Sequence, residues 1–525
     1  MVSAAARILP MGEHALLLEV DTLQDATDLH RRLDAARPPG VVDLVPAART
    51  VLVRVDPPLT LAAARAWIAA TTTDSASLPL ATADLVELEV TYDGADLAET
   101  AALLGMTAEE LVRRHTGAEW TVAFTGFAPG FGYLVSPDWP FDVPRLLSPR
   151  TRVPRGSVGL AGGFTGAYPR ETPGGWRLIG TTSAPLFDVD AASPALLAPG
   201  TRVRFRPVTA SSSRETARGG RDSGQTPQSG PPHAVSREGD LRVDEPGLLA
   251  TVQDLGRPGA AALGVAPSGA LDRGAARTAN RLVGNAEGAA VIEVTMGGFR
   301  ATAGRDHWFA VAGAWGPIRL AGIEIDPYEA HAWPAGAELH LDWFAHGARA
   351  YLAVRGGIEA AQALGSRSTD VLAGIGAAHV QAGDALRVGE ATAPIPVAAL
   401  APWGAPHDDE LEVELAPGPR AEWFTASARR RLFDAVWTVT NDADRVGMRL
   451  DGPPLERERP GELPSEGMVP GALQVPPSGR PTILLADGPV TGGYPVIAVA
   501  TDAALDLLAQ ARPGTRLRFR HARLA

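Results

Sequence analysis

The chain has 525 residues, of which 45% are hydrophobic and 21% charged, the composition of a folded globular protein rather than a fibrous or wholly disordered one. Its net charge of −12 argues against bulk binding to a nucleic-acid backbone. There is no cysteine, and all 48 basic residues are arginine. These two facts exclude disulfides, thiolate nucleophiles, lysine-containing phosphate loops, Schiff bases and a biotin attached to this chain. No leader pattern or long apolar run is present, so we expect a cytoplasmic protein without membrane contact.

The first predicted unit is a small α+β domain over residues 1–80. Strand-like runs at 15–20 and 50–55 alternate with runs at 23–36 and 59–70, in which apolar residues recur at helical spacing. This alternation predicts two helices packed against a small sheet.

The second predicted unit spans residues 83–208. It opens with a clearly alternating strand at 85–90, followed by a helix pair over 96–116. Thr107 is placed as the N-cap of the second helix, with Glu110 at the capping-box position. After this pair, the sequence is rich in glycine, proline and β-branched residues, which indicates short strands and tight turns.

A polar stretch over 209–239 has almost no large apolar residues. It cannot offset the entropy of ordering, so we predict a disordered linker that joins two once-separate proteins. Beyond it, turn-rich sequence predicts two halves, 240–400 and 405–525, separated by an Ala-Pro-Trp-Gly break. Helices in this part are expected at 275–283, 420–432 and 501–510.

Two sequence strings occur twice and in the same order. Thr-Gly-Ala-Tyr-Pro at 165–169 returns as Thr-Gly-Gly-Tyr-Pro at 491–495. Pro-Gly-Thr-Arg-Val-Arg-Phe-Arg at 199–206 returns, with one change, at 513–520. Copies so far apart indicate duplicated domains rather than a short-period solenoid.

The densest run of glycine and arginine, residues 149–176, suggests an anion site in the first part. Glycine lets backbone approach a ligand, and arginine grips carboxylate or phosphate with two N–H groups, so Arg150 and Arg152 are catalytic candidates. The alternative is that these glycines only form tight turns. His115 suits either a general base or a structural histidine. Candidates for substrate or nucleotide binding in this part are Gly130, Tyr133, Thr165, Gly166 and Tyr168.

In the second part, carboxylates and arginines stand beside glycine turns, where they could coordinate Mg²⁺, transfer a proton or neutralise an anion. Aspartate and serine beside glycine also make ordinary turns and caps, so that interpretation stays open. No histidine pair has metal-ligand spacing, and metal ligands are left unassigned. The catalytic candidates are Asp254, Arg257, Asp272, Arg445, Glu466 and Asp487. The binding candidates are Arg355, Arg367, Asp370, Gln474, Thr491, Gly492 and Tyr494.

Taken together, these stretches resemble the allophanate hydrolase subunit 1 and subunit 2 families, which include the B and C subunits of bacterial 5-oxoprolinase. Residues 85–207 are similar to subunit 1 through the run at 126–134, Pro-Arg-Thr-Arg-Val-Pro at 149–154 and Pro-Gly-Gly-Trp at 173–176. Residues 243–522 are similar to subunit 2 through the motifs at 252–258, 279–285, 365–370 and 487–495. The resemblance implies a mainly β fold with α+β parts. Cyclophilin-like β-barrel domains would occur in duplicate, with a barrel-like half at 240–400, and the small N-terminal α+β domain would precede them.

The resemblance also implies an activity. With a separate third subunit, such a chain would use ATP and Mg²⁺ to open the lactam of 5-oxoproline to L-glutamate, through a phosphorylated imidate hydrolysed at the partner's site. The same modules form the carboxyltransferase part of urea carboxylase, so a biotin-dependent carboxyltransferase for urea or a similar amide is an alternative, with biotin carried by a partner. A non-catalytic inhibitor of a histidine kinase is a third interpretation. The oligomeric state, including a homo-oligomer, is left open.

Three positions depart from the expected family pattern. Thr181 stands where many subunit 1 relatives carry arginine, and Pro489-Val490 replaces a more usual Gln-Thr. If these side chains contact the ligand, the substrate differs from that of the relatives.

Overall fold

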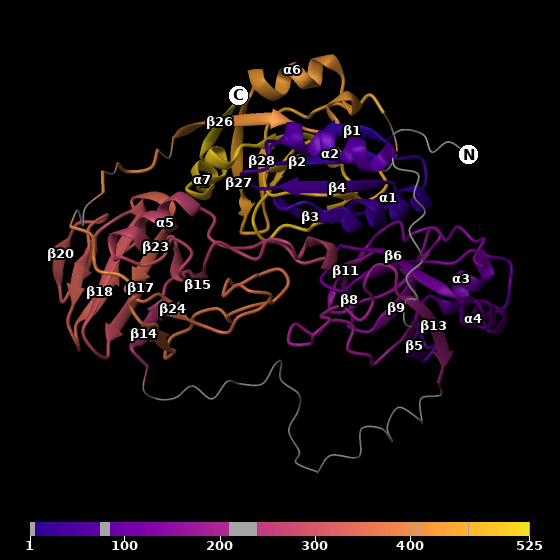
Figure 1. The fold of residues 1–525 in the computed structure, drawn as a ribbon, viewed down its shortest axis with the longest axis horizontal. Helices are drawn as coiled ribbons and strands as arrows, with labels where there is room; N and C mark the ends of the chain where they lie inside the picture. The colour runs from indigo at the N-terminus through magenta and orange to yellow at the C-terminus, as the bar shows by residue number, and fades with distance from the viewer. Residues whose placement is uncertain are drawn as a thin grey trace, which may run out of the picture.

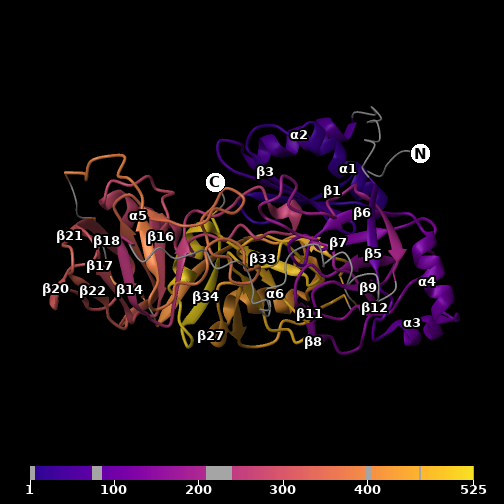
Figure 2. The ribbon, with the colours of Figure 1, turned by 90° about the horizontal axis from the view of Figure 1, so that it is seen from below.

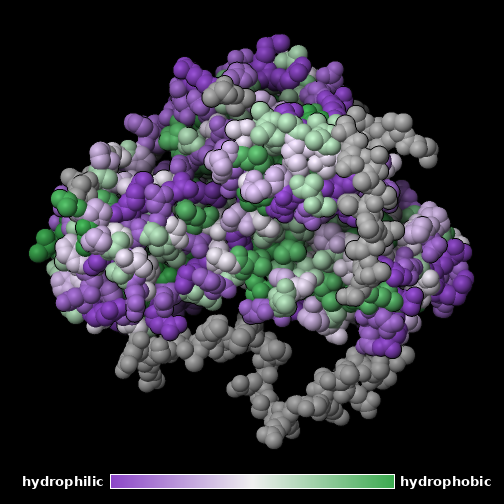
Figure 3. Space-filling view, viewed as in Figure 1, coloured by the Kyte–Doolittle hydropathy of each residue, from purple (hydrophilic) through white to green (hydrophobic). Residues whose placement is uncertain are grey.

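The computed structural model describes residues 6–73, 85–208, 239–397, 401–402, 404–407, 409–459, 461 and 463–523. The linker expected over 209–239 lies outside the described residues apart from Gly239. In Figure 1 residues 239–397 form the lobe at the left and residues 85–208 the lobe at the right, with the N-terminal unit and the C-terminal barrel between and above them. Hydrophilic residues cover most of the outer parts of this face, and a group of hydrophobic residues lies near its middle (Figure 3).

The N-terminal unit is a four-stranded antiparallel sheet in the order β1-β2-β4-β3. Leu16 and Leu18 pack under the two helices, whereas Leu17 between them faces the C-terminal barrel, because side chains alternate along a strand. Both faces of the sheet are therefore covered, and the predicted strands and helices are confirmed. The elements are β1 (Arg7–Pro10), β2 (Ala15–Glu19), α1 (Leu23–Ala35), β3 (Val41–Pro46), β4 (Thr50–Val55) and α2 (Leu61–Thr73).

The second unit is a seven-stranded sheet in the order β12-β9-β10-β7-β6-β13-β5. A bridge between Thr91 and Thr181 joins its two edges, so the sheet curls nearly into a barrel. As predicted, Thr107 caps α4 by accepting a hydrogen bond from the backbone N–H of Glu110 at 3.2 Å. The elements are β5 (Leu85–Val90), α3 (Leu97–Leu103), α4 (Ala108–Gly117), β6 (Trp120–Thr125), β7 (Gly132–Val135), β8 (Arg150–Val153), β9 (Ser157–Ala161), β10 (Phe164–Ala167), β11 (Thr172–Gly174), β12 (Arg177–Thr181) and β13 (Arg202–Pro207).

Where we expected a barrel-like half, residues 239–397 form two packed sheets, in the orders β20-β19-β22-β17-β14-β25-β24 and β15-β16-β23-β18-β21. On β18, Phe309 and Val311 face the core between the sheets, whereas Ala310 and Ala312 face α5. The elements are β14 (Leu241–Pro246), β15 (Leu249–Gln253), η2 (Ala261–Leu263), α5 (Arg273–Leu282), β16 (Val291–Thr295), β17 (Phe299–Ala303), β18 (His307–Trp315), β19 (Ile318–Leu320), β20 (Ile323–Ile325), β21 (His331–Trp333), β22 (Glu338–Leu341), β23 (His346–Val354), β24 (Ile358–Glu359) and β25 (Ala385–Val388).

The C-terminal half is a closed barrel in the order β26-β33-β30-β31-β28-β27-β34. The helix predicted over 420–432 begins later than expected, because η3 and a turn precede α6, whose N-cap is Thr425. The elements are β26 (Glu410–Pro417), η3 (Ala421–Trp423), α6 (Ala426–Asp434), β27 (Val436–Ala443), β28 (Gly447–Asp451), β29 (Glu466–Gly467), β30 (Ala472–Gln474), β31 (Thr482–Leu484), β32 (Thr491–Gly492), β33 (Val496–Ala500), α7 (Asp502–Ala509) and β34 (Arg516–His521).

The second unit and the C-terminal barrel repeat one architecture. The duplicated Arg-x-Arg-Phe-Arg strings form β13 and β34, and each pairs in parallel with the first strand of its unit, β5 or β26. Trp120 donates its indole N–H to the carbonyl of His115, and Trp437 donates to the carbonyl of Leu432, both at 3.0 Å and both five residues back. These matched details confirm the duplication predicted from the repeated strings.

The parts separated by the linker are packed together. Leu9 and Leu52 of the N-terminal unit share a buried cluster with Val499 of the barrel, and Figure 2 shows that unit lying along one side of the barrel. The repeated motif contributes directly, because Thr491 Oγ1 accepts the backbone N–H of Phe127 at 2.9 Å. The two halves of the chain therefore form joint interfaces.

Candidate functional site at the junction of the two parts

Arg445, which precedes β28, lies at the centre of a fully buried charge network. Its Nε donates to Asp487 Oδ2 at 2.9 Å, its Nη1 to Glu293 Oε1 at 2.6 Å and its Nη2 to the carbonyl of Gly269 at 2.7 Å. Burial alone would lower the pKa of Arg445, but Glu293 and Asp487 reverse the effect and hold this pKa above its usual value. The arginine is therefore permanently charged and fully paired.

Asp487 links this network to the sandwich. Its Oδ1 accepts from Ser268 Oγ at 2.6 Å, and its Oδ2 accepts from the backbone N–H of Val371 at 3.0 Å. Ser268 holds a positive φ of 53°, which is unusual for a residue other than glycine and fixes the turn in this position.

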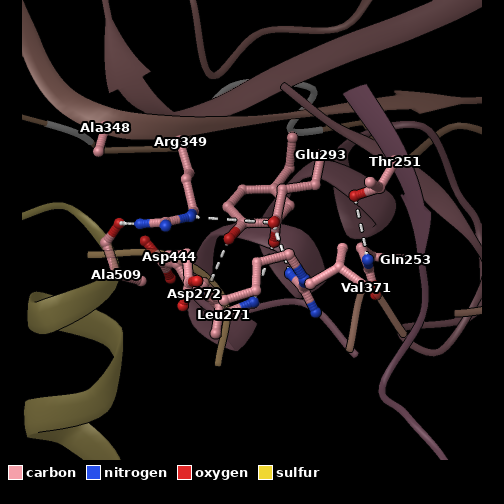
Figure 4. A network of polar contacts seen from close by, with 12 residues as sticks. Thr251, Gln253, Leu271, Asp272, Glu293, Ala348, Arg349, Val371, Asp444 and Ala509 are labelled. Atoms are coloured by element: carbon pink, nitrogen blue, oxygen red, sulfur yellow. Dashed lines mark hydrogen bonds and ion pairs between the residues drawn. The ribbon is translucent and has the colours of Figure 1, made fainter. Parts of the chain in front are cut away.

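Glu293 extends the network toward α5 and α7 (Figure 4). It accepts the backbone N–H of Leu271 at 3.0 Å and approaches Arg349 at 3.9 Å, while Arg349 donates to the carbonyl of Ala509 at 2.6 Å. Asp272 caps α5 and accepts from Gln510 at 2.7 Å. Burial, reinforced by nearby carboxylates, raises the pKa of Asp272 to about 7.

Asp254 organises the loop that follows β24. It accepts hydrogen bonds from Ser366 Oγ at 2.6 Å, Ser368 Oγ at 2.5 Å, the backbone N–H of Arg367 at 2.7 Å and that of Gly256 at 2.7 Å. Both carboxylate oxygens are thus engaged, which favours a structural role in shaping residues 365–370.

Beside this loop, buried polar atoms without partners are concentrated. Arg257 is 1% exposed and donates to the carbonyls of Ala363 and Ser368, but its Nη1 has no partner. Asp370 is 1% exposed; its Oδ1 accepts from Ala373 N at 2.8 Å and its Oδ2 has no partner. Buried polar groups are rarely left unpaired, so free atoms gathered in one place point to a bound molecule. The other unpartnered atoms here are Gln253 Oε1, Arg367 Nε and Thr369 Oγ1.

An arginine of the first part reaches the same place. Arg170, which follows the first Tyr-Pro motif, interacts electrostatically with Asp370: burial lowers the pKa of Arg170, and Asp370 opposes that shift. Burial, with repulsion from Asp487, raises the pKa of Asp370 to about 6, and Arg257 offsets part of the rise. We define the junction site as Arg170, Arg257, Arg367 and Asp370, which combine free N–H donors with a carboxyl that titrates near neutral pH.

The other candidates of the first part lie away from the junction site. Arg150 pairs with Asp96 at 2.6 Å, and Arg152 pairs with Glu171 at 2.6 Å in an exposed position. Both guanidinium groups are therefore held by ion pairs within the second unit, and their catalytic role stays a prediction.

The aromatic candidates form a core. Tyr133 stacks on Phe124 with ring centroids 4.3 Å apart, and Tyr168 is buried beside them. Gly130 has a φ of +75° and donates its N–H to the carbonyl of Leu263 at 2.9 Å, so it serves the interface between the parts.

His115 is a structural residue in this arrangement. It lies between Tyr92 Oη at 2.7 Å and Thr165 Oγ1 at 2.9 Å, and burial lowers its pKa to about 3. The imidazole is therefore neutral. Gly166 is packed closely, because a Cβ there would lie 2.7 Å from the carbonyl oxygen of Gly132.

A second group of candidates surrounds Glu466. Both of its oxygens accept from Arg420 Nε, at 3.0 and 3.1 Å, and Arg420 also pairs with Glu19 of the N-terminal unit at 2.7 Å. These residues line a cavity of about 80 Å³. Other candidates in this half are Gln474, bonded to Met468 Sδ at 3.3 Å, Thr491 and Gly492 in β32, and Tyr494, which is 47% exposed. Arg355 lies elsewhere and donates to the carbonyl of Ala393 at 3.0 Å.

Sequence reasoning missed four residues of these networks. Arg170 directly follows the repeated Tyr-Pro motif, and Ser268 precedes a glycine that was noted for its turn. Glu293 stands in the otherwise apolar strand β16, and a lone charge in such a strand is the signal that could have been used. Arg349 has no comparable sequence signal.

Comparisons with known proteins describe what the chain is similar to. The family model "Carboxyltransferase domain, subdomain C and D" matches residues 6–197, and "Carboxyltransferase domain, subdomain A and B" matches residues 263–521. The chain is 35% identical to the C subunit of 5-oxoprolinase from Escherichia coli K12, over 53% of this chain and 90% of that protein. It is 38% identical to the B subunit of 5-oxoprolinase from Escherichia coli O157:H7, over 38% of this chain and 96% of that protein.

A solved structure matches nearly the whole chain. TTHA0988 superposes with a TM-score of 0.82 at 36% identity, covering 96% of this chain and 99% of that one. Fold and comparisons thus define a protein built from paired carboxyltransferase subdomains. The chain belongs to the family that contains the B and C subunits of 5-oxoprolinase, here joined in one polypeptide. Over the described residues, no helix has both the length and the apolar character to cross a membrane.

Proposed function

We propose that the chain is the combined B and C component of an ATP-dependent 5-oxoprolinase, which converts 5-oxo-L-proline to L-glutamate with a separate third subunit. One observation carries the proposal: unpartnered buried polar atoms gather where Arg170 of the B-like part meets Arg257 and Asp370 of the C-like part. A ligand at this place would need both parts. Their fusion in one chain keeps them together.

The junction site suits the chemical groups of 5-oxoproline. The free N–H donors of Arg257 and Arg367, with the charge of Arg170, suit a carboxylate. The unpartnered Oδ2 of Asp370 suits the lactam N–H. One ligand carrying a carboxylate and an amide N–H would satisfy both kinds of atom.

In the proposed reaction, ATP supplies the phosphoryl group that activates the lactam carbonyl oxygen. As the C=O oxygen gains that group, the lactam nitrogen forms a C=N bond and gives its proton to Asp370 Oδ2. Asp370 must be ionised to act as this base, and a pKa of about 6 leaves it ionised at neutral pH while keeping it basic enough to accept a proton. Hydrolysis to glutamate would follow at the partner's site.

The residues of the junction site do not fit Mg²⁺. Mg²⁺ is held by carboxylates together with phosphates and water, and Asp370 Oδ2 is the one carboxylate oxygen without a partner among the described residues of the site, since those of Asp254 and Asp487 accept hydrogen bonds. No step is therefore assigned to the metal, and the junction is proposed as the substrate site rather than the nucleotide site.

A carboxyltransferase is the second candidate function. Both parts match carboxyltransferase subdomain models, which favours it. Such an enzyme would use an amide substrate and a biotin carried by a partner, because this chain has no lysine.

The test is formation of ADP and glutamate by the full chain with the third subunit. Asp370→Asn and Arg257→Gln should each abolish most of the coupled activity, whereas Arg305→Gln, which changes an exposed ion pair with Asp240, should retain it. Absence of glutamate with a competent partner would overturn the oxoprolinase proposal. Carboxylation of urea by the chain with a biotinylated partner would then identify a carboxyltransferase.

A further inference from the structure

A cavity of about 210 Å³ lies between β4 of the N-terminal unit and the starts of α5 and α7. Figure 1 shows α5 and α7 adjacent to each other beside the barrel, and the backbone N–H of Arg273 donates to Asp506 at 2.8 Å. The volume is several times the roughly 30 Å³ that one water occupies in the liquid. A small molecule therefore fits.

The carboxylates around this cavity are already paired inside the protein. Glu13 Oε2 accepts the backbone N–H of Asp502 at 3.0 Å, and Asp502 pairs with His14 at 3.3 Å. Asp506 accepts the backbone N–H groups of Arg273 and Gly274, at 2.8 and 3.2 Å. The ligand atoms of Glu13, His14 and Asp502 lie within 4.8 Å of one another, but these groups satisfy each other and offer a cation little free capacity.

The arginines around the cavity are not satisfied in the same way. Arg54 Nε donates to Asp43 at 2.9 Å, but its Nη2 is buried without a partner. Arg277 Nε is also buried without a hydrogen bond, and its ion-pair contact with Glu287 is at 3.6 Å. The guanidinium of Arg273 makes no hydrogen bond or ion pair with the described residues. The free capacity of the cavity is therefore made of N–H donors.

The charges point the same way. Burial lowers the pKa of Arg273, Asp502 opposes the shift, and the neighbouring Arg54 and Arg277 add to it. An oxyanion between the three guanidinium groups would relieve their repulsion and accept their free N–H groups.

We propose that this cavity binds the carboxylate or phosphoryl group of a small molecule, held by Arg54 from the B-like part and by Arg273 and Arg277 from the C-like part. The proposal does not rest on 5-oxoprolinase activity. Because the ligand would touch both parts, its binding stabilises their association as well as the folded chain.

The test is calorimetric titration of the full chain, without a third subunit, with inorganic phosphate and separately with L-glutamate. We expect one of the two probes to bind and to raise the melting temperature. Arg273→Gln should weaken that binding by at least about tenfold, the loss expected for charge-assisted hydrogen bonds. Competition between the probes distinguishes a phosphoryl site from a carboxylate site.

The matched control is Arg281→Gln on the same helix, where Arg281 pairs with Glu287 and does not line the cavity. It should bind the probe as the unmodified chain does, and so should Arg257→Gln at the junction site. Arg277→Gln serves as a second variant if Arg273→Gln does not fold. Failure of both probes to bind, or unchanged binding in the folded cavity variant, would overturn the proposal.

Discussion

Arg445 and Arg257 are both almost fully buried in the C-like part, yet they are held in opposite ways. Every nitrogen of the Arg445 guanidinium donates to a carboxylate or carbonyl, whereas Arg257 keeps one buried nitrogen free, as does its neighbour Asp370 with one oxygen. A satisfied buried charge binds the parts of a protein to each other, and an unsatisfied one has capacity left for a ligand. The difference separates the network that builds the junction from the site that we propose binds substrate.

The largest expected effect is on stability at Arg445. Arg445→Met leaves Glu293 and Asp487 buried without their cation, and removing one partner of a buried charge pair costs about 3–5 kcal/mol. Denaturant unfolding measures the loss. Arg449→Met, which removes an exposed pair with Asp442, should change stability by less than about 1 kcal/mol. Equal losses in the two variants would contradict the assigned role of Arg445.

At Asp370 the expected effect is on activity and not on stability. In Asp370→Asn, the amide oxygen can still accept the N–H of Ala373, while the proton acceptor is lost. Turnover should fall by about 100-fold or more, as for loss of a general base, with little change in unfolding free energy. A variant that unfolds as readily as Arg445→Met would show that Asp370 belongs to the structural network.

The same carboxyl sets a pH dependence. If its ionised form is the base, turnover with the third subunit should rise as pH increases through about 6 and then level off. A pH–rate profile measures this, and Asp370→Asn should lack the rising limb. A rate that falls through the same range would reverse the assignment to a general acid.

Asp272 should set a pH dependence of stability instead. Its pKa is raised from 3.8 to about 7, so the folded chain binds this proton more tightly than the unfolded chain between these values. Stability should therefore fall as pH rises from about 4 to 7 and level off above that range. Unfolding at pH 5 and pH 8 tests the slope, which Asp272→Asn should reduce.

The smallest expected effect is at His14, which joins the N-terminal unit to Asp502 of the barrel. Its pKa is raised chiefly by the hydrogen bond with Asp502, so the stabilisation is present below pH 6.5 and is lost as pH rises through the raised value. Because both side chains are partly exposed, His14→Gln should cost less than about 1 kcal/mol at pH 5.5 and less still at pH 8.5. Unfolding at the two pH values checks this order.

The architecture was readable in the sequence because its signals are local or repeated. The strings that predicted duplication form β13 and β34, and Thr107 with Glu110 predicted the start of α4. The packed sheets of 239–397 were not foreseen, because alternation within strands does not say which strands pair.

The site was readable only in part. Asp370, Arg257 and Arg367 were chosen as polar residues near glycine turns, but so was Asp254, whose oxygens are taken up by its own turn. Residue type could not separate these cases, because the difference lies in which atoms remain unpaired. The interaction of Arg170 with Asp370 joins residues far apart in the chain and needed the fold.

The most direct test of the account is binding of 5-oxoproline to the full chain, measured by calorimetry with the unmodified protein, Arg257→Gln and the exposed control Arg305→Gln. We predict that the unmodified chain and the control bind alike, and that Arg257→Gln binds at least about tenfold more weakly through loss of a charge-assisted contact. Equal binding by Arg257→Gln would contradict the claim that the unpaired atoms of the junction site receive the substrate.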